Sequence, residues 1–237
     1  MTNVAGNTGR ITWIDEIKGL MLLIVLVEHV GLIPGYLNYV IVFLGAMAMP
    51  CYFALSGYLY STKRDFREFF SRKCHSLLFP YLVLSLLLLL LDHRLYMGEA
   101  SSVIGQNLHK IFIECSSTEK GTPLWFVLTL FWMELLNYPL CKRGRHPEYM
   151  MLGLGVLFSI VAKMLYSADV RLLFNLNSFF TAYLFFALGY WLKNKAVVSR
   201  ILERASRKTV WTASLVTLCF MGVLVVLTPD MGGGIQR

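Results

Sequence analysis

The stretch that decides the fold is residues 14–30, which read IDEIKGLMLLIVLVEHV. From Ile17 onward this stretch is typical of a membrane helix, yet it carries Lys18 near one end and the adjacent Glu28 and His29 near the other. Roughly 20 helical residues cross the hydrocarbon core of a bilayer, and ionisable groups within such a span are costly and mark functional sites. The three ionisable residues therefore need a physical explanation.

The composition of the whole chain is that of an integral membrane protein. Of its 237 residues, 57% are hydrophobic and 15% are charged, whereas a soluble domain carries about 25% charged residues. The net charge is +8, but the basic residues form short clusters between apolar runs, which favours membrane topology over nucleic-acid binding. The five cysteines are scattered without a C-x-x-C motif, so we expect neither a disulfide framework nor a metal site.

Seven apolar runs predict an all-α, polytopic bundle of transmembrane helices, forming a single domain over residues 1–237. Strand-like alternation is absent from these runs, and the first has no signal-peptide cleavage site, so we expect it to be a signal anchor. The runs cover residues 17–34, 39–60, 76–91, 123–141, 149–166, 172–192 and 210–228.

The distribution of Lys and Arg predicts a cytoplasmic N-terminus. The connections 61–75, 142–148 and 193–209 hold 14 basic residues, and those on the opposite side hold four. Because basic residues are concentrated in cytoplasmic loops, the first set is expected in the cytoplasm. The one long connection, 92–122, then faces outside, where it either covers a substrate cleft or is an ordinary polar loop.

Helical phase relates the ionisable residues of the opening stretch. At about 100° per residue, the eleven steps from Lys18 to His29 end about 20° past three full turns, so the two side chains share one face about 16 Å apart. Asp15 lies within about 40° of this line if the helix extends back that far, and Glu28 points about 100° away from His29. The stripe between Lys18 and His29 is apolar: Leu22 and either Val25 or Leu26.

Each of these residues also has an interpretation without a catalytic role. Lys18 alone is a basic anchor that extends to the interface, and His29 alone is a hydrogen-bonding side chain between helices. Their shared face favours a functional site, since an ionised group at the bilayer centre costs about 2.5–3.5 kcal/mol on insertion scales.

The pattern Asp15-x-x-Lys18-Gly19, with His29 ten residues after Gly19, resembles the first helix of the membrane acyltransferase-3 family. Four further segments resemble motifs of this family in the same order. They are PCYFALSGYL at 50–59, the basic pair 72–73 leading to Pro-Tyr at 80–81, LWFV at 124–127 with Leu130, and FFALGY at 185–190. Lys18 stands where the family usually has Arg, and Ser76, beside His75, stands roughly where it has another basic residue.

This resemblance implies an enzyme of the bacterial inner membrane that O-acetylates sugars of surface polysaccharides. Its partners are then the lipid bilayer, an acyl-CoA and a carbohydrate acceptor, with no nucleic acid. Members of the family usually have about ten spans, each of roughly 20 residues, so the chain is expected to be a C-terminally truncated, partial domain.

By the same resemblance, the donor is acetyl-CoA as a co-substrate, with no permanently bound cofactor. Cations at the cytoplasmic surface would meet its phosphates, and the candidates are Lys18, Arg72 and Lys73. Ser56 and Tyr58, at the end of the second span, are candidates for further donor contacts. The alternative for Arg72 and Lys73 is a topological role alone, and for Ser56 and Tyr58 it is packing.

We expect His29 to be the general base of acyl transfer, since its unperturbed pKa is about 6.5. Lys18 would assist electrostatically, and Asp15 or Glu28 would orient the imidazole. An acyl-His29 intermediate is the alternative mechanism.

Two residues of the fourth span are candidates for contacts with the acceptor substrate. Trp125 lies near the external interface, where tryptophan is also common as an anchor. Glu134 lies deeper, where an ionisable residue marks a functional site by its position.

Two other classes of function compete with acyl transfer. A transporter or flippase would also place ionisable groups in its spans, although the inverted repeats and broken helices common in transporters are not evident. The other alternative is an inactive fragment that acts only as a membrane scaffold.

Overall fold

The structure, a computed structural model, describes residues 12–30, 36–95, 124–170 and 172–197, together with His109, Arg200 and Thr212. All regular secondary structure in these residues is helical, which confirms the prediction of an all-α fold. The predicted span 210–228, apart from Thr212, and most of the connection 92–122 lie outside the described residues. The chain divides into two compact units, one formed by Met1–Tyr52 with Ser199–Arg237 and the other by Phe53–Val198.

In the first unit, helix α1 (Thr12–Val30) carries the opening stretch as one continuous α-helix. The helix reaches back beyond Asp15, as the phase argument requires. Ile14 and Val25 are buried and Lys18 is half-buried, whereas Leu22 is 53% exposed. The packed face of α1 therefore follows Ile14, Lys18 and Val25. Of the apolar residues predicted along the line from Lys18 to His29, Val25 is buried and Leu22 is exposed.

The second helix of this unit meets α1 at Lys18. Helix α2 runs over Tyr36–Leu59, and the Tyr52 hydroxyl donates a hydrogen bond of 2.7 Å to the backbone carbonyl of Lys18. Tyr52 belongs to the YFALSGYL segment. A residue of one family-like motif thus contacts the backbone of another, within the described part of the first unit.

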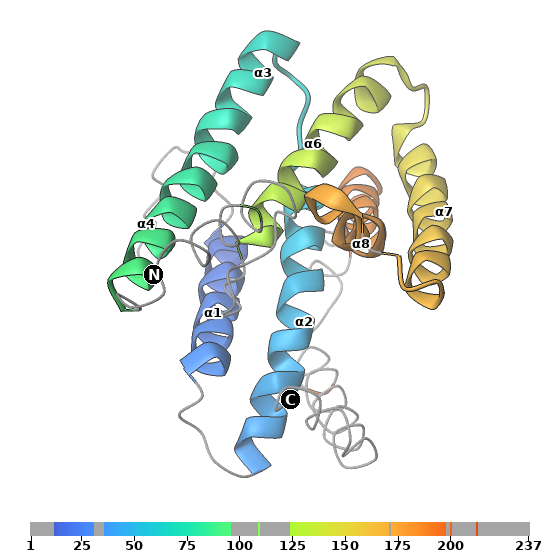
Figure 1. Ribbon diagram of the computed structural model, residues 1–237. Coiled ribbons are helices and arrows are strands. Elements are labelled where there is room, and N and C mark those ends of the chain that lie inside the picture. Colours follow the sequence, from blue (N-terminus) through green and yellow to red (C-terminus); the bar gives the residue numbers. More distant parts are fainter. Residues whose placement is uncertain are drawn as a thin grey trace, which may run out of the picture. The chain divides into compact units, whose positions relative to one another are not determined.

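The second unit contains the end of α2 and the remaining helices (Figure 1). Its helices are α3 (Phe66–Lys73), η1 (Cys74–Leu78), α4 (Phe79–Leu95), α6 (Trp125–Arg143), α7 (Pro147–Ser167), η3 (Leu173–Asn175) and α8 (Leu176–Asn194). The core is rich in aromatic rings, among them Phe53, Tyr60, Phe69, Tyr183 and Phe186, and it joins α2, α3, α6, α7 and α8.

A π-helical turn interrupts the long helix that follows the basic connection. In η1 the Phe79 N–H bonds to the Cys74 carbonyl, five residues back, and α3, η1 and α4 continue one another in Figure 1. Proline has no N–H and its ring clashes with the carbonyl four residues earlier, so Pro80 favours a widened turn just before it. Such π-bulges are frequent at functional sites, and this one directly follows Arg72 and Lys73.

Large hydrophobic side chains are exposed along α4 and α7, the most exposed being Tyr166, Met164, Leu90 and Phe79. Large exposed apolar faces are typical of surfaces that contact protein or membrane. Among the described helices, α7, with 21 residues, is the one that meets the length and composition needed to cross a bilayer. The full set of seven spans stays a prediction.

Two glycines allow α2 and α8 to approach closely. A Cβ atom on Gly57 would overlap the backbone carbonyl of Phe186, and a Cβ on Gly189 would overlap that of Ala54. Small residues at helix interfaces permit this approach in membrane proteins. The segments 50–59 and 185–190, both matched to family motifs, are therefore packed against each other.

We expect Gly57→Ala to lower the free energy of unfolding by about 1–3 kcal/mol, the usual cost of overpacking a core. Gly153→Ala on α7 is the matched control, because its Cβ would have no neighbour within 4 Å and alanine favours helix. Denaturant unfolding of both variants in detergent micelles measures the difference. Equal stability of the two variants would show that α2 and α8 do not need this contact.

Candidate functional site

A cavity of about 240 Å³ lies between the end of α2, the linker that follows it and helix α3. Its lining residues are Leu59, Tyr60, Ser61, Arg64, Phe69, Arg72 and Lys73. Three of these seven side chains are basic, so the cavity suits an anionic group. Its volume is below the roughly 300–1,000 Å³ of sites that enclose a whole drug-sized ligand, which fits one charged end of a larger molecule.

Hydrogen bonds from α6 and α8 hold the linker that forms one wall of this cavity. The Tyr60 hydroxyl donates to the Glu134 carbonyl (2.8 Å), and Lys193 Nζ donates to the Tyr60 carbonyl (2.8 Å). The Tyr138 hydroxyl donates to the Arg64 carbonyl (2.9 Å). Burial, with a smaller contribution from nearby Lys63, holds the pKa of Lys193 below its usual value.

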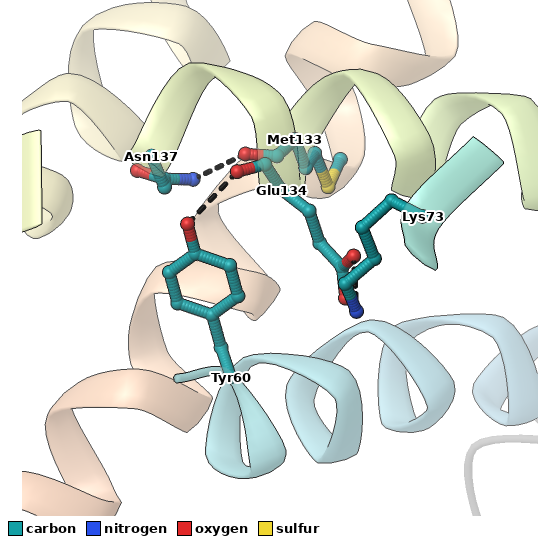
Figure 2. Close-up of polar contacts among 5 residues, drawn as sticks. All are labelled: Tyr60, Lys73, Met133, Glu134 and Asn137. Carbon is teal, nitrogen blue, oxygen red and sulfur yellow. Dashed lines mark hydrogen bonds and ion pairs between the residues drawn. The ribbon is translucent and has the colours of Figure 1, made fainter. Parts of the chain in front are cut away.

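An ion pair between α3 and α6 holds another lining residue, Lys73. Lys73 Nζ lies 2.6 Å from a carboxylate oxygen of Glu134, and Figure 2 shows the two side chains meeting between their helices. The Lys73 ammonium also lies 5.7 Å from the centre of the Phe69 ring. The sequence marked both Glu134 and Lys73 as candidates but did not predict that they form a pair.

The three basic residues of the cavity differ in their carboxylate partners. Arg64 pairs with Glu68, one turn along the chain, and both side chains are about half exposed, so this pair contributes little. Lys73 is paired with Glu134. Arg72 is exposed and, within the described part of the chain, has no carboxylate partner. Its guanidinium is therefore the strongest candidate for binding an incoming anion.

A buried polar chain fixes α8 against α6 beside this site. The Tyr183 hydroxyl donates to Asn137 Oδ1 (2.5 Å), and Asn137 Nδ2 donates to the Met133 carbonyl (2.8 Å; Figure 2 shows the latter contact). Buried polar groups are costly unless they are paired. These two hydrogen bonds pair both the oxygen and the nitrogen of the Asn137 amide, and they orient the turn of α6 that carries Glu134.

A second ion pair joins the start of α7 to the end of α8. Lys195 Nζ lies 3.4 Å from a Glu148 carboxylate oxygen and 4.8 Å from the centre of the Tyr149 ring. Bonds to Tyr149 and Glu148 raise the pKa of Lys195, and the helix N-terminal amide of Glu148, followed by Lys195, lowers the pKa of Glu148.

Described residues in or next to the three basic connections 61–75, 142–148 and 193–209 thus contact one another within the second unit. Lys193 reaches the Tyr60 carbonyl, Tyr138 reaches the Arg64 carbonyl and Lys195 reaches Glu148.

The predicted donor contacts divide into two groups. Arg72 and Lys73 line the cavity, whereas Ser56 and Tyr58, half-buried in the last turns of α2, are not among its lining residues. Ser61 lines it instead, a residue that the sequence did not single out. The donor roles of these four residues, and that of Lys18 on α1, stay predictions.

The other predicted site residues lie elsewhere. Asp15 is exposed on α1 and Lys18 is half-buried on the packed face. The backbones of Glu28 and His29 are in the last turn of the same helix, and their side chains lie outside the described part of the structure. Trp125 opens α6 with its ring centre 6.5 Å from that of Phe53, in the core. Their catalytic or substrate roles stay predictions.

The sequence also missed Arg64 and Tyr60 as individual site residues. Arg64 was one of five basic residues in its connection, and Tyr60 stood at the end of an apolar run. The only available signal was that Tyr60 directly follows a family-like motif and precedes the basic connection.

Comparison with known families decides the identity of the chain. A family model described as an acyltransferase domain matches residues 11–234. The chain belongs to the acyltransferase-3 family. The resemblance inferred from the motifs is thereby confirmed, and the match extends beyond the region that those motifs cover.

Members of the acyltransferase-3 family are associated with membranes, and α7 is a helix able to span one. In general terms, therefore, the chain is a membrane acyltransferase. Searches of curated proteins and of solved structures returned no match for this member of the family.

Proposed function

We propose that this acyltransferase transfers an acetyl group from acetyl-CoA to a hydroxyl of a cell-surface sugar or polysaccharide, at the bacterial inner membrane. The observation that carries the proposal is the basic cavity of the second unit, in a chain that belongs to the acyltransferase-3 family. Coenzyme A is a polyanion at one end, and its acyl thioester is at the other. The cavity, with its lining arginines, suits the charged end.

The proposed donor contact is a charge-assisted bond from Arg72 to a phosphate of coenzyme A. The planar guanidinium presents a fork of N–H donors that matches phosphate oxygens, and Arg72 borders the cavity without a described carboxylate partner. Ser61 and Arg64 line the same cavity and would supply a hydroxyl donor and a second cation.

The proposed base is the imidazole of His29. It accepts the proton of the sugar hydroxyl while the hydroxyl oxygen attacks the acetyl carbonyl; the thiolate of coenzyme A then leaves and takes up a proton. An alternative in two steps has the imidazole nitrogen attack the thioester first and the sugar hydroxyl attack the resulting acyl-imidazole. The continuous helix α1 supports the shared phase of Lys18 and His29, which both routes use.

The proposal is tested by adding acetyl-CoA with a labelled acetyl group to membranes that contain the chain, and then isolating glycan. Label in base-labile ester linkage to glycan is the expected result. A transporter or an inert fragment gives no such ester in membranes that lack other acetyltransferases. Label that fails to appear in any glycan or lipid-linked sugar would refute acyl transfer by this chain.

Lys18→Ala is expected to raise the KM for acetyl-CoA about tenfold, the loss of roughly one charged hydrogen bond. Lys163→Ala is the matched control, because Lys163 is an exposed lysine on another helix, α7. Initial rates of both variants in nanodiscs, at varied acetyl-CoA, measure the effect. Equal kinetics would leave Lys18 with the role of a topological anchor.

A further inference from the structure

One residue of α6, Glu134, contacts two residues that line the basic cavity, Lys73 and Tyr60. Its carboxylate lies 2.6 Å from Lys73 Nζ, at the end of α3, and its backbone carbonyl accepts the hydrogen bond from the Tyr60 hydroxyl, at the end of α2 (Figure 2). Lys73 and Tyr60 both line the cavity, whereas Glu134 does not. Glu134 is thus joined to two residues of the lining, Tyr60 and Lys73.

The two members of the ion pair are buried to different degrees. The side chain of Glu134 is 6% exposed, and that of Lys73 is 29% exposed. Removing one member of a buried pair leaves an uncompensated charge, which is strongly unfavourable. Moving Lys73 to a donor phosphate would therefore give up its 2.6 Å pairing with a buried carboxylate. Lys73 is better suited to remain with Glu134 than to act as a ligand for the donor.

The position of the pair shows what it stabilises. Lys73 is the last residue of α3, between Arg72 and the π-helical turn that begins at Cys74. A helix with a widened turn has lost the regular hydrogen-bond register at that point. The ion pair between Lys73 and Glu134 fixes the direction of α3 where the π-helical turn begins. It thereby also fixes the position of the neighbouring Arg72 side chain at the cavity.

We propose that Glu134 is a positioning residue for the donor cavity, acting through Lys73, which serves as its counter-ion and not as a ligand for the donor. This inference rests on the proposed function for the identity of the donor. It assigns Glu134 to the donor side of the reaction, in place of the acceptor contact that the sequence alone suggested.

The test compares Glu134→Gln and Lys73→Met with the apolar double variant Lys73→Met/Glu134→Met, in the full chain in nanodiscs. Each single variant is expected to raise the KM for acetyl-CoA and the dissociation constant of coenzyme A about fivefold, with kcat within about twofold. The reason is that each variant loses the ion pair between Lys73 and Glu134, which holds α3 against α6. A buried ion pair can be replaced by apolar side chains of similar volume without loss of stability. The double variant is therefore expected to restore both constants to within about twofold of wild type.

Glu148→Gln is the matched control. It breaks the Lys195–Glu148 pair, which lies in the same unit but is not part of the cavity lining. Its KM and dissociation constant should equal those of wild type. If the double variant keeps the full defect of Lys73→Met, Lys73 contacts the donor directly and the proposal is overturned.

Hydrogen exchange separates failure of this inference from failure of the proposed function. Glu134→Gln is expected to lower the protection of amides in residues 66–78, and the double variant to restore it, whether or not the protein binds coenzyme A. Wild-type protein that binds no coenzyme A would refute the proposed donor alone. Unchanged protection in Glu134→Gln would refute the positioning role alone.

Discussion

His29→Ala is expected to abolish acetyl transfer to glycan while the chain still inserts into the membrane. A positioned general base contributes about 10²–10⁴-fold to the rate of such a reaction, and alanine can neither accept the hydroxyl proton nor carry the acyl group. The measurement is the ester-linked acetyl content of glycan from cells that express each variant, normalised to the amount of chain in the membrane fraction.

Val27→Ala is the control for this experiment, since Val27 is an exposed residue two positions earlier in the same helix. It should insert and acetylate as wild type does. Retained acetylation in His29→Ala would remove His29 from the chemistry. Incubation of wild type with labelled acetyl-CoA and no acceptor distinguishes the two mechanisms, because only the two-step route leaves label on the protein.

Arg72→Ala is expected to raise the KM for acetyl-CoA and the dissociation constant of coenzyme A by about 10–100-fold, since a bond between two charged groups contributes about 1.5–3 kcal/mol. Arg72→Lys should recover part of this loss, because lysine keeps the charge but lacks the planar fork. Titration calorimetry with coenzyme A, alongside initial rates, measures both constants.

Arg67→Ala is the matched control, because Arg67 is an exposed arginine on the same helix that does not line the cavity. It removes the same charge from the same connection, so any general effect of net charge on binding or topology appears in both variants. If the two variants bind coenzyme A equally well, Arg72 contributes only to topology and the cavity is not the donor site.

Much of the second unit could be predicted from the sequence because the relevant signals are local. Apolar runs without alternation predict helices wherever they occur, and the basic connections 61–75, 142–148 and 193–209 were predicted on one side of the membrane. Described residues in or next to them contact one another in the structure. The start of the third helix was less predictable. It begins at Phe66, ten residues before the predicted apolar run. The residues in between, which include polar and basic ones, are helical and join the apolar run through a π-helical turn.

The partners within the site could not be predicted in this way. Lys73 and Glu134 are 61 positions apart in the chain, and no periodicity relates them. Lys73 was a candidate as part of a basic pair that resembles a family motif, and Glu134 as an ionisable residue within a span, and each was assigned to a different substrate. Only their contact across α3 and α6 shows that they neutralise each other, which changes the expected role of both.

By itself, the sequence determined the helical class of this protein, its membership of the acyltransferase-3 family and the alignment of Lys18 with His29 along one helix. Those features follow from composition and from a repeat of 3.6 residues per turn, which act within a single segment. Tertiary structure alone decided which basic side chain is left to meet an anion and which is already paired. Burial and counter-ions depend on neighbours brought from distant segments, so pairing Lys73 with Glu134 leaves Arg72 as the proposed anion-binding residue of the cavity.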